Sequence, residues 1–440
     1  MPALEGSPVY YFISDLHIGG EGNLAVCDFE VELIEFLQSL SAAEQPSELI
    51  IVGDAFSFWE MTRTPTLQKL ATTAAQHPAL FEQFRQTGKS VRITLIPGNH
   101  DYELACYPDF VKALANYNIH LEVAEVITRE VAGRQIWIEH GHQHDSFNAI
   151  ADFGNPSVTP LGYYIVSQIV DGLSERSQRG KYPWLKDIES VYPNEEVPYW
   201  LFSNYFYKEM SPVLRWALVP FLLLMSVSLF VLIGAALERT GILPVGFFSI
   251  SWQAFLKSFG FAGRALDIMV NFVLLIDSLF IAAAILVLIP VLLIFRDLRK
   301  TLRNYGFQGH KGLKNNKESL YIEAAKAVFE RSPNTVLFIY GHTHQPSLID
   351  LNNRYVINTG SWLKRLQRIP SRFRFLPGVY YPSFQLNYFK ISETEEGISL
   401  SYHCVSKSVE LGLTALENFA IWGRETRFPI DIPPHTTIAQ

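Results

Sequence analysis

The sequence predicts an α/β fold that is interrupted by a pair of membrane-spanning helices. Three observations lead to this expectation. Short apolar segments that resemble buried strands alternate with helical patterns in two separate blocks of the chain. Clusters of histidine and acidic residues follow several of these segments. Finally, only 18% of the 440 residues are charged, against about 25% in an ordinary soluble domain, and the missing charges are concentrated between the two blocks.

The first block, residues 1–205, alternates strands and helices. Val9 to Ile13 is a short run of β-branched and aromatic residues, which is typical of a strand buried on both faces. Three later runs have the same character: Leu49 to Val52, Val91 to Ile96 and Gln135 to Glu139. Helical periodicity lies between them, over Phe29 to Leu40 and Leu67 to Arg85. This alternation favours a layered α/β architecture.

The second block, residues 306–440, continues the same pattern. Thr335 to Tyr340 and Arg354 to Ile357 are again expected to be core strands. Phe384 to Ile391 and Ile398 to Val405 alternate enough to form an antiparallel pair. We therefore expect the two blocks to form one domain, with residues 206–305 inserted between them.

The insertion contains two long apolar stretches. Residues 216–237 carry no charge, and residues 268–295 carry only Asp277. About 20 apolar residues cross a bilayer, so both stretches predict membrane spans rather than a pair of core helices. Asp277 is expected to lie at the end of the second span and to face the headgroups. The less favoured alternative is a functional group inside the membrane. The apolar and aromatic link 239–267 fits an interfacial helix, a re-entrant segment or a short loop.

Basic residues flank both ends of this hairpin. Lys208 and Arg215 precede the first span, and four basic residues follow the second: Arg296, Arg299, Lys300 and Arg303. Positive residues beside short membrane segments mark the cytoplasmic side. The aromatic stretch 199–207 fits an interface belt just before the first span. We therefore predict an integral membrane protein with two spans, whose blocks and termini are all cytoplasmic.

The rest of the composition agrees with this location. The first residues lack the charged and apolar regions of a secretory signal peptide. Three distant cysteines, Cys27, Cys106 and Cys404, argue against a disulfide framework and fit a reducing compartment. A net charge of −7 gives no support to nucleic-acid binding, which usually needs a basic face.

Polar clusters follow the predicted core strands. They are Asp15-Leu16-His17, Gly53-Asp54, Gly98-Asn99-His100-Asp101, His140-Gly141-His142 and Gly341-His342-Thr343-His344. Ligand sites in α/β sheets lie outside the carboxyl ends of strands, and imidazole with carboxylate suits Mn, Fe or Zn. An aspartate such as Asp54 can bridge two ions about 3.5–4 Å apart, and such a pair activates water as hydroxide and clamps phosphate oxygens. Glycine before Asp54, Asn99, His142 and His342 is expected to let the backbone turn sharply.

The ordered motifs DLH, GD, GNHD, HGH and GHTH resemble those of the calcineurin-like metallophosphoesterases. This resemblance implies a four-layer sandwich of two β-sheets flanked by helices. It implies one metal held by Asp15, His17, Asp54 and His344, and a second held by Asp54, Asn99, His140 and His342. It further implies that His100 contacts the scissile phosphate and stabilises or protonates it, while Asp101 orients the His100 ring. The residues alone leave open whether His140 or His142 is the ligand.

Within that superfamily, YFISDLHI and GDAFSFWE look like the UDP-2,3-diacylglucosamine pyrophosphatases of lipid A synthesis. Those enzymes commonly read GNRD where this chain has GNHD, and they lack the two spans, so the resemblance leaves the substrate open.

Four residues are candidates for substrate contact: Trp59, His142, Ser361 and Arg365. Each has a structural alternative. Trp59 and Ser361 could instead serve packing, and His142 could simply line the site. Arg365 belongs to a basic run that also contains Lys364, Arg368, Arg372 and Arg374. Such a run is usually a solvated loop, although anionic headgroups attract basic residues near a bilayer.

The leading hypothesis is a membrane-anchored dimetal phosphoesterase that hydrolyses a phosphoester or pyrophosphate bond, with a lipid-linked substrate as one option. The alternative is an anchored phosphodiesterase or phosphatase acting on soluble nucleotides or phosphoproteins. A non-catalytic membrane scaffold is disfavoured because the ligand set is complete. The expected cofactors are two divalent ions, manganese first, with iron, zinc or magnesium as alternatives. The expected partners are a phosphate-containing substrate and the bilayer.

Overall fold

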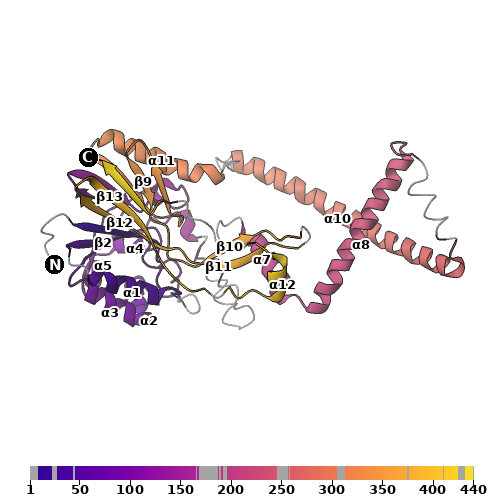
Figure 1. Ribbon diagram of the computed structural model, residues 1–440, viewed down its shortest axis with the longest axis horizontal. Helices are drawn as coiled ribbons and strands as arrows, with labels where there is room; N and C mark the ends of the chain where they lie inside the picture. Colours follow the sequence, from indigo (N-terminus) through magenta and orange to yellow (C-terminus); the bar gives the residue numbers. More distant parts are fainter. Residues whose placement is uncertain are drawn as a thin grey trace. The chain divides into compact units, whose positions relative to one another are not determined.

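The computed structural model describes residues 8–21, 27–42, 45–164, 166–167, 187, 190–191, 196–244, 256, 258–304, 313–373, 376–409, 411–424 and 432–439 (Figure 1). The chain divides into two compact units. The first combines Met1–Asn204 with Lys314–Gln440, and the second is Tyr205–Leu313. Each unit is described by itself below.

The first unit is built on a seven-stranded mixed sheet with the order β14-β13-β12-β1-β2-β3-β4. Its parallel strands are β1 (Val9–Ile13), β2 (Ser47–Val52), β3 (Arg92–Ile96) and β4 (Ile119–Leu121). Its antiparallel strands are β12 (Leu386–Thr394), β13 (Gly397–Val405) and β14 (His435–Ala439). Phe12 of β1 lies opposite Ile50 on one side and Phe389 on the other. The predicted α/β fold is therefore confirmed as one with mixed sheets, and β1 joins the two blocks.

A second, five-stranded sheet has the order β5-β6-β7-β9-β8. Its strands are β5 (Val126–Val131), β6 (Arg134–Glu139), β7 (Thr335–Tyr340), β8 (Ser347–Asp350) and β9 (Tyr355–Asn358). β6 pairs in parallel with β7, although about 200 residues separate them along the chain. Both sheets therefore combine strands from before and after the insertion.

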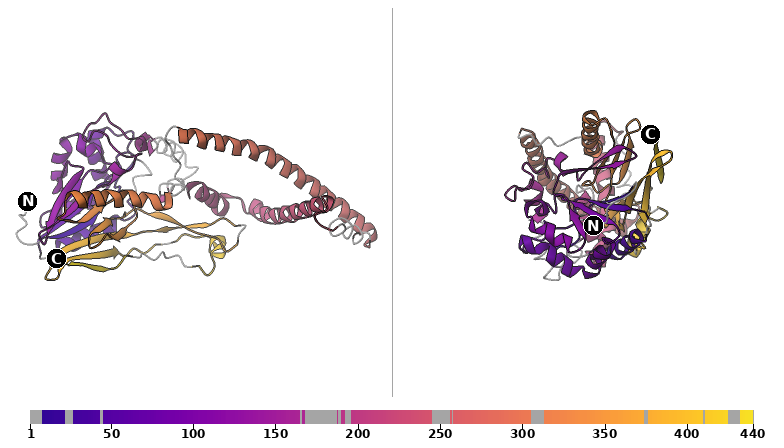
Figure 2. Two further views of the ribbon diagram at one scale, coloured as in Figure 1. Left: turned by 90° about the horizontal axis from the view of Figure 1, so that it is seen from above. Right: turned by 90° about the vertical axis from the view of Figure 1, so that its left-hand side faces the viewer.

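The two faces of the sheets are covered differently. Tyr10 and Phe12 of β1 pack with Ile136 and Ile138 of β6, so one apolar cluster lies between the sheets. The alternate residues of β1 pack toward a layer of helices: α1 (Glu30–Ser41), α2 (Thr66–Gln76), α3 (Pro78–Thr87), α4 (Glu103–Cys106) and α5 (Asp109–Ala115). On the opposite side, α11 (Leu313–Arg331) covers the smaller sheet (Figures 1 and 2). The order of layers is helix, sheet, sheet, helix.

The predicted helix over Leu67 to Arg85 is two helices. α2 ends at Gln76 and α3 begins at Pro78, with His77 between them at φ −125° and ψ 56°. A proline disfavours the helical conformation in the residue before it and cannot donate to the preceding turn. Pro78 therefore ends one helix and begins the next.

A smaller group of elements lies beyond the large sheet in the first unit (Figure 1). β10 (Arg365–Ile369) and β11 (Val379–Ser383) form an antiparallel pair, so Arg365 and Arg368 of the predicted basic run lie in a strand rather than in a loop. Arg374 lies outside the described residues. α7 (Val197–Asn204) packs against β11, and a short helix α12 (Ala415–Ala420) lies between β13 and β14 along the chain.

The second unit begins with a π-helical turn, Tyr205–Glu209, and contains two long helices that contact each other (Figures 1 and 2). α8 (Pro212–Arg239) includes the first predicted span, and α10 (Gly260–Asn304) includes the second. Among the described residues, one helical stretch, Gly260–Ile294 of α10, is long and apolar enough to cross a membrane. Residues 245–255 and 257 of the predicted link lie outside the described residues, whereas residues 260–267 belong to α10.

Asp277 does not lie at a helix end. α10 runs without interruption from Gly260 to Asn304, and the Asp277 side chain is buried inside the second unit. The residues immediately before it are apolar helix formers, so the helix does not begin at Ser278. The expectation that a helix end lies at Asp277 is therefore wrong.

Candidate metal centre

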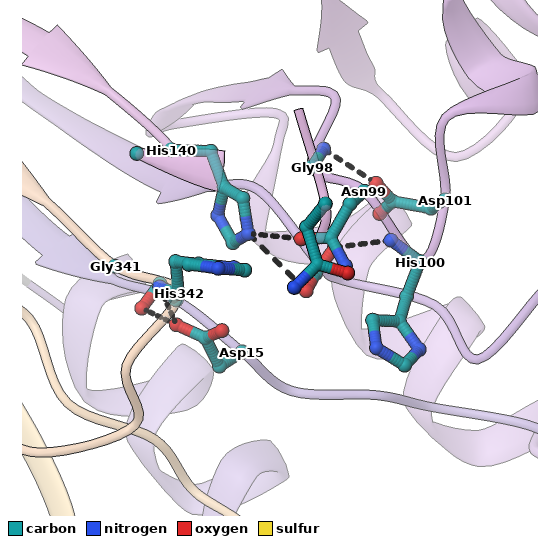
Figure 3. Close-up of polar contacts among 12 residues, drawn as sticks. Asp15, Gly98, Asn99, His100, Asp101, His140, Gly341 and His342 are labelled. Carbon is teal, nitrogen blue, oxygen red and sulfur yellow. Dashed lines mark hydrogen bonds and ion pairs between the residues drawn. The ribbon is translucent and has the colours of Figure 1, made fainter. Parts of the chain in front are cut away.

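The carboxyl ends of strands from both sheets converge on one buried cluster of polar side chains (Figure 3). Asp15 and His17 follow β1, Asp54 follows β2, and His100 follows β3. From the smaller sheet, His140 follows β6, and His342 and His344 follow β7. Since parallel strands end at the same edge of a sheet, the topology explains why residues so distant in sequence meet here.

The first group within this cluster comprises Asp15, His17, Asp54 and His344. The Nε2 atoms of His17 and His344 face each other at 3.3 Å. His344 Nε2 lies 3.1 Å from Asp15 Oδ1, and His17 Nε2 lies 3.7 Å from Asp54 Oδ2. Two imidazole nitrogens and two carboxylate oxygens therefore point at a common position.

The second group comprises Asp54, His140 and His342, with Asn99 beside it. His140 Nε2 lies 3.2 Å from Asp54 Oδ2 and 3.1 Å from Asn99 Oδ1. The Nδ1 atom of His140 donates to the carbonyl oxygen of Val52 at 2.8 Å, which aims Nε2 at the cluster. Asp54 belongs to both groups, as a bridging carboxylate would.

The donor set fits divalent cations. Asp15 Oδ1 and Asp54 Oδ2 are buried and accept no hydrogen bond among the described residues, which is costly for a carboxylate unless a cation balances it. Burial, with a smaller effect from His100, lowers the pKa of His17 to about 3, so this imidazole is neutral. Burial raises the pKa of Asp54, but His140 and His100 outweigh it and hold that pKa well below its usual range. Neutral imidazole and ionised carboxylate are the forms that ligate metals.

Backbone strain is concentrated at the same residues. Nine non-glycine residues in the described part of the chain have positive φ, and five of them belong to the cluster. These five are Asp15 (52°), His17 (46°), Asp54 (52°), His342 (65°) and His344 (57°). Such conformations persist only where the surrounding structure holds them, and they gather at functional sites.

Two glycines in the motifs are required by close approach. A Cβ atom on Gly98 would lie 2.1 Å from Asp54 Oδ1, and one on Gly341 would lie 2.7 Å from Asp15 Oδ2. The expectation of a sharp backbone turn holds at Gly53, where φ is 78°. At Gly98 and Gly341, the missing side chain instead makes room for a carboxylate.

The His100 ring is held by Glu60 and Trp59. His100 Nδ1 donates to Glu60 Oε1 at 2.9 Å, and the ring lies 4.3 Å from that of Trp59. On its other side the ring lies 4.6 Å from the ring of His17, which places His100 beside the first group. Burial raises the pKa of Glu60, but His100 outweighs it and lowers that pKa below its ordinary value, so the carboxylate is ionised. Lys69 Nζ donates to the carbonyl oxygen of Phe58 at 2.7 Å and thereby fixes the loop that carries Trp59 and Glu60.

Asp101 is buried between the loops that follow β3 and β2. Its carboxylate accepts the backbone N–H groups of Gly98 at 2.6 Å and Ala55 at 2.7 Å, so it ties together the loops after β3 and β2. Its oxygens face those amides, whereas Nδ1 of the His100 ring donates to Glu60. Glu60, six residues after Asp54, belongs to the aromatic stretch after the GD motif, for which the sequence leaves substrate contact and packing open. Its hydrogen bond with the His100 ring is not indicated by the sequence.

The four candidates for substrate contact lie near the cluster but differ in what they touch. Trp59 is buried against His100 and has Tyr163 edge-on at 5.8 Å. Ser361 Oγ donates to the carbonyl oxygen of Asp15 at 2.9 Å, and Arg365 donates to that of His344. These two residues therefore support the ligand loops.

His142 is buried, and neither of its ring nitrogens has a hydrogen-bond partner in the described structure. Its ring lies 5.5 Å from that of His140, and the two metal-ligand groups contain His140 and not His142. His144 contacts Glu139 Oε1 at 2.6 Å, and Asp145 Oδ2 lies 3.2 Å from His342 Nε2. The contact with Asp145 orients the His342 ring of the second group.

Residues 9–205 match the family model of the calcineurin-like phosphoesterases. None of the curated proteins compared with the chain matches it. Among solved structures, the chain is similar to a predicted phosphoesterase from Streptococcus pneumoniae, at 9% identity over 93% of this chain and 96% of that one, with a TM-score of 0.28. It is also similar to zinc-bound Vps29 from Entamoeba histolytica, at 7% identity over 90% and 99% of the two chains, with a TM-score of 0.25. Because both TM-scores are below 0.5, these two structures carry no argument. The family match covers residues 9–205, less than half of the chain, and it supports a metal-dependent hydrolase.

Proposed function

We propose that this metal-dependent hydrolase, a calcineurin-like phosphoesterase by its family match, is anchored in a membrane and hydrolyses a phosphoester or pyrophosphate bond of a lipid-linked substrate. The proposal has three parts: the dimetal site, the anchor and the substrate. Each part is supported by different residues.

The observation that carries the dimetal site is the buried pair of groups that share Asp54. We assign Asp15, His17, Asp54 and His344 to one ion, and Asp54, Asn99, His140 and His342 to the other. When bound, two divalent cations supply Lewis-acid activation of water and neutralise charge on a phosphate. Of the candidate metals, manganese is the one we propose.

The chain's own residues supply the remaining chemistry. His100 projects from the loop that carries Asn99, and its backbone N–H donates to Asp54 Oδ1 at 2.7 Å (Figure 3). Glu60 holds Nδ1 of His100, so Nε2 is the atom that meets a phosphoryl or leaving-group oxygen. Trp59 packs on this ring and excludes water from one side of it.

The membrane anchor is supported by the division of the site between the two blocks. Asp15 and His344 lie 3.1 Å apart, so the segment between them leaves and re-enters the same side of any membrane that it crosses. A single crossing by α10 is incompatible with this arrangement. α8 is the second long helix of the unit and carries the other uncharged stretch, so we propose a two-span hairpin. The basic residues at both ends favour the cytoplasm for the catalytic unit.

Two experiments test the proposal. Purified full-length protein loaded with Mn²⁺ is given an aryl phosphodiester, and Asp54→Ala is expected to lose activity and metal, whereas the exposed Glu35→Gln is expected to retain both. Persistent hydrolysis by Asp54→Ala would contradict the site assignment. A panel of lipid-linked and soluble phosphoesters then tests the substrate, and turnover of soluble nucleotides alone would exclude the lipid class.

A further inference from the structure

One end of the first unit presents a single surface built from three segments. α7 and α12 are both attached to the segment that joins β10 to β11 (Figure 1). Ser203 Oγ of α7 donates to the carbonyl oxygen of Gly378 at 2.7 Å, and the backbone N–H of Arg372 donates to that of Ala420 in α12 at 2.8 Å. We call this surface the aromatic–arginine surface. Its members are Tyr199, Phe202, Phe373, Phe419, Trp422, Arg368, Arg372 and Arg424.

The aromatic rings of this surface are exposed. Trp422 is 68% exposed, Tyr199 59%, Phe202 56% and Phe419 51%. The ring of Phe419 stacks on that of Phe373 at 4.9 Å, so these two rings lie together rather than singly. Scattered exposed apolar residues need no explanation, but a group of large aromatic rings on one face indicates an interaction site.

Arginines are interleaved with these rings. Arg368 lies over the ring of Tyr199 at 5.2 Å, and Arg372 Nη1 donates to the carbonyl oxygen of Trp422 at 3.2 Å. Among the described residues, two acidic groups beside the surface are already engaged: Glu196 pairs with Arg368 at 3.0 Å, and Glu417 is buried in the N-cap of α12. Arg372 and Arg424 form no ion pair within the described part of the chain. The surface therefore carries positive charge.

Aromatic rings combined with basic side chains match the chemistry of the bilayer interface. Such rings sit at the level of the headgroups, and arginine is attracted to anionic lipid. Along the chain, α7 is followed after residues 205–211 by the long helix α8. We propose that the aromatic–arginine surface rests on the headgroup layer of a bilayer that contains anionic lipid. This inference rests on the membrane part of the proposed function and adds a second, peripheral contact to it.

The test is hydrogen exchange measured by mass spectrometry on full-length protein in nanodiscs. The discs contain phosphatidylcholine alone or with added phosphatidylglycerol, and the same protein in detergent serves as the reference. Amides of α12 and of residues 371–373 are expected to exchange several-fold more slowly in the anionic discs, while those of α3 do not change. The double variant Arg372→Gln/Arg424→Gln is expected to remove this difference, because each arginine accounts for about a five-fold change in affinity for an anionic surface. Arg85→Gln, an exposed arginine on α3, is the matched control and is expected to change nothing.

Two results would overturn the inference. Equal exchange of α12 in detergent, neutral discs and anionic discs means that the surface does not touch lipid. Protection that already occurs in detergent and rises with protein concentration means that another copy of the chain covers it.

Failure of the anchor is a separate outcome. In that case carbonate extraction releases the protein from membranes, and flotation with phosphatidylglycerol vesicles tests the surface alone. Flotation that is lost in the double variant then sustains the surface contact, whereas absence of flotation by the parent protein overturns it.

Discussion

The contact between Glu60 and His100 leads to a prediction that separates positioning of the ring from metal binding. Glu60 Oε1 accepts a hydrogen bond from His100 Nδ1 at 2.9 Å, and both side chains are largely buried. A hydrogen bond to a charged group contributes about 1.5–3 kcal/mol. If the bond holds the ring in the reacting geometry, its loss lowers kcat by about 10- to 150-fold.

Two substitutions at Glu60 separate the contribution of its charge from that of its hydrogen-bond acceptor. Glu60→Gln keeps an acceptor but removes the charge, so kcat is expected to fall by about ten-fold, at the weak end of the range. Glu60→Ala removes both, and kcat is expected to fall toward the 150-fold end. KM is expected to change little, because the bond orients a group that acts on the reacting phosphate and not the rest of the substrate.

The assay measures kcat and KM on an aryl phosphodiester, with metal content determined by elemental analysis of the same samples. Glu35→Gln, on the exposed side of α1, controls for loss of an acidic residue. Unchanged kcat in Glu60→Ala refutes the positioning role. Loss of activity that follows loss of bound metal also refutes it, since Glu60 would then act through the ions.

Three further predictions follow from the same loops. In Gly98→Ala the new Cβ would lie 2.1 Å from Asp54 Oδ1, so the bridging carboxylate is displaced. Kinetic assays are expected to show that kcat/KM falls by about 100-fold or more, and elemental analysis is expected to show less bound metal. In Asp101→Ala, three backbone N–H groups lose their buried acceptor, so denaturant unfolding is expected to show a loss of about 2–3 kcal/mol, whereas the exposed Glu35→Gln keeps parental stability. Removal of metal with a chelator leaves Asp15 Oδ1 and Asp54 Oδ2 buried without a hydrogen-bond donor or a cation, so Tm is expected to fall and to return when Mn²⁺ is added. At a free metal concentration 100 times Kd, each occupied site contributes about 2.7 kcal/mol to the free energy of unfolding. An unchanged Tm after verified metal removal would contradict that last expectation.

Much of the architecture was predictable because buried strands leave a simple pattern. The run Val9 to Ile13 coincides with β1, and Thr335 to Tyr340 coincides with β7. The expected antiparallel pair is present as β12 and β13. Both the strands and the polar clusters after them are local features of the sequence, and parallel pairing then brings the clusters to one edge.

Other features depend on tertiary contacts that no local pattern reports. Glu60 meets His100 only because the loop after β2 folds back over the loop after β3, and Lys69 secures it from α2. For the same reason, the sequence could not show that Asp101 faces backbone amides. The break at His77 is different, since Pro78 marked it in the sequence.

The position of β1 between β2 and β12 has a consequence for biosynthesis. Until β12 emerges from the ribosome, β1 presents an unpaired strand edge, and both long helices are synthesised during that interval. At about 5–20 residues per second, the roughly 370 intervening residues take about 20–75 s. An open edge of this kind recruits other strands and promotes aggregation. The order of synthesis therefore requires the nascent N-terminal half to be protected, by a chaperone or by early membrane targeting, before the ligand set is complete.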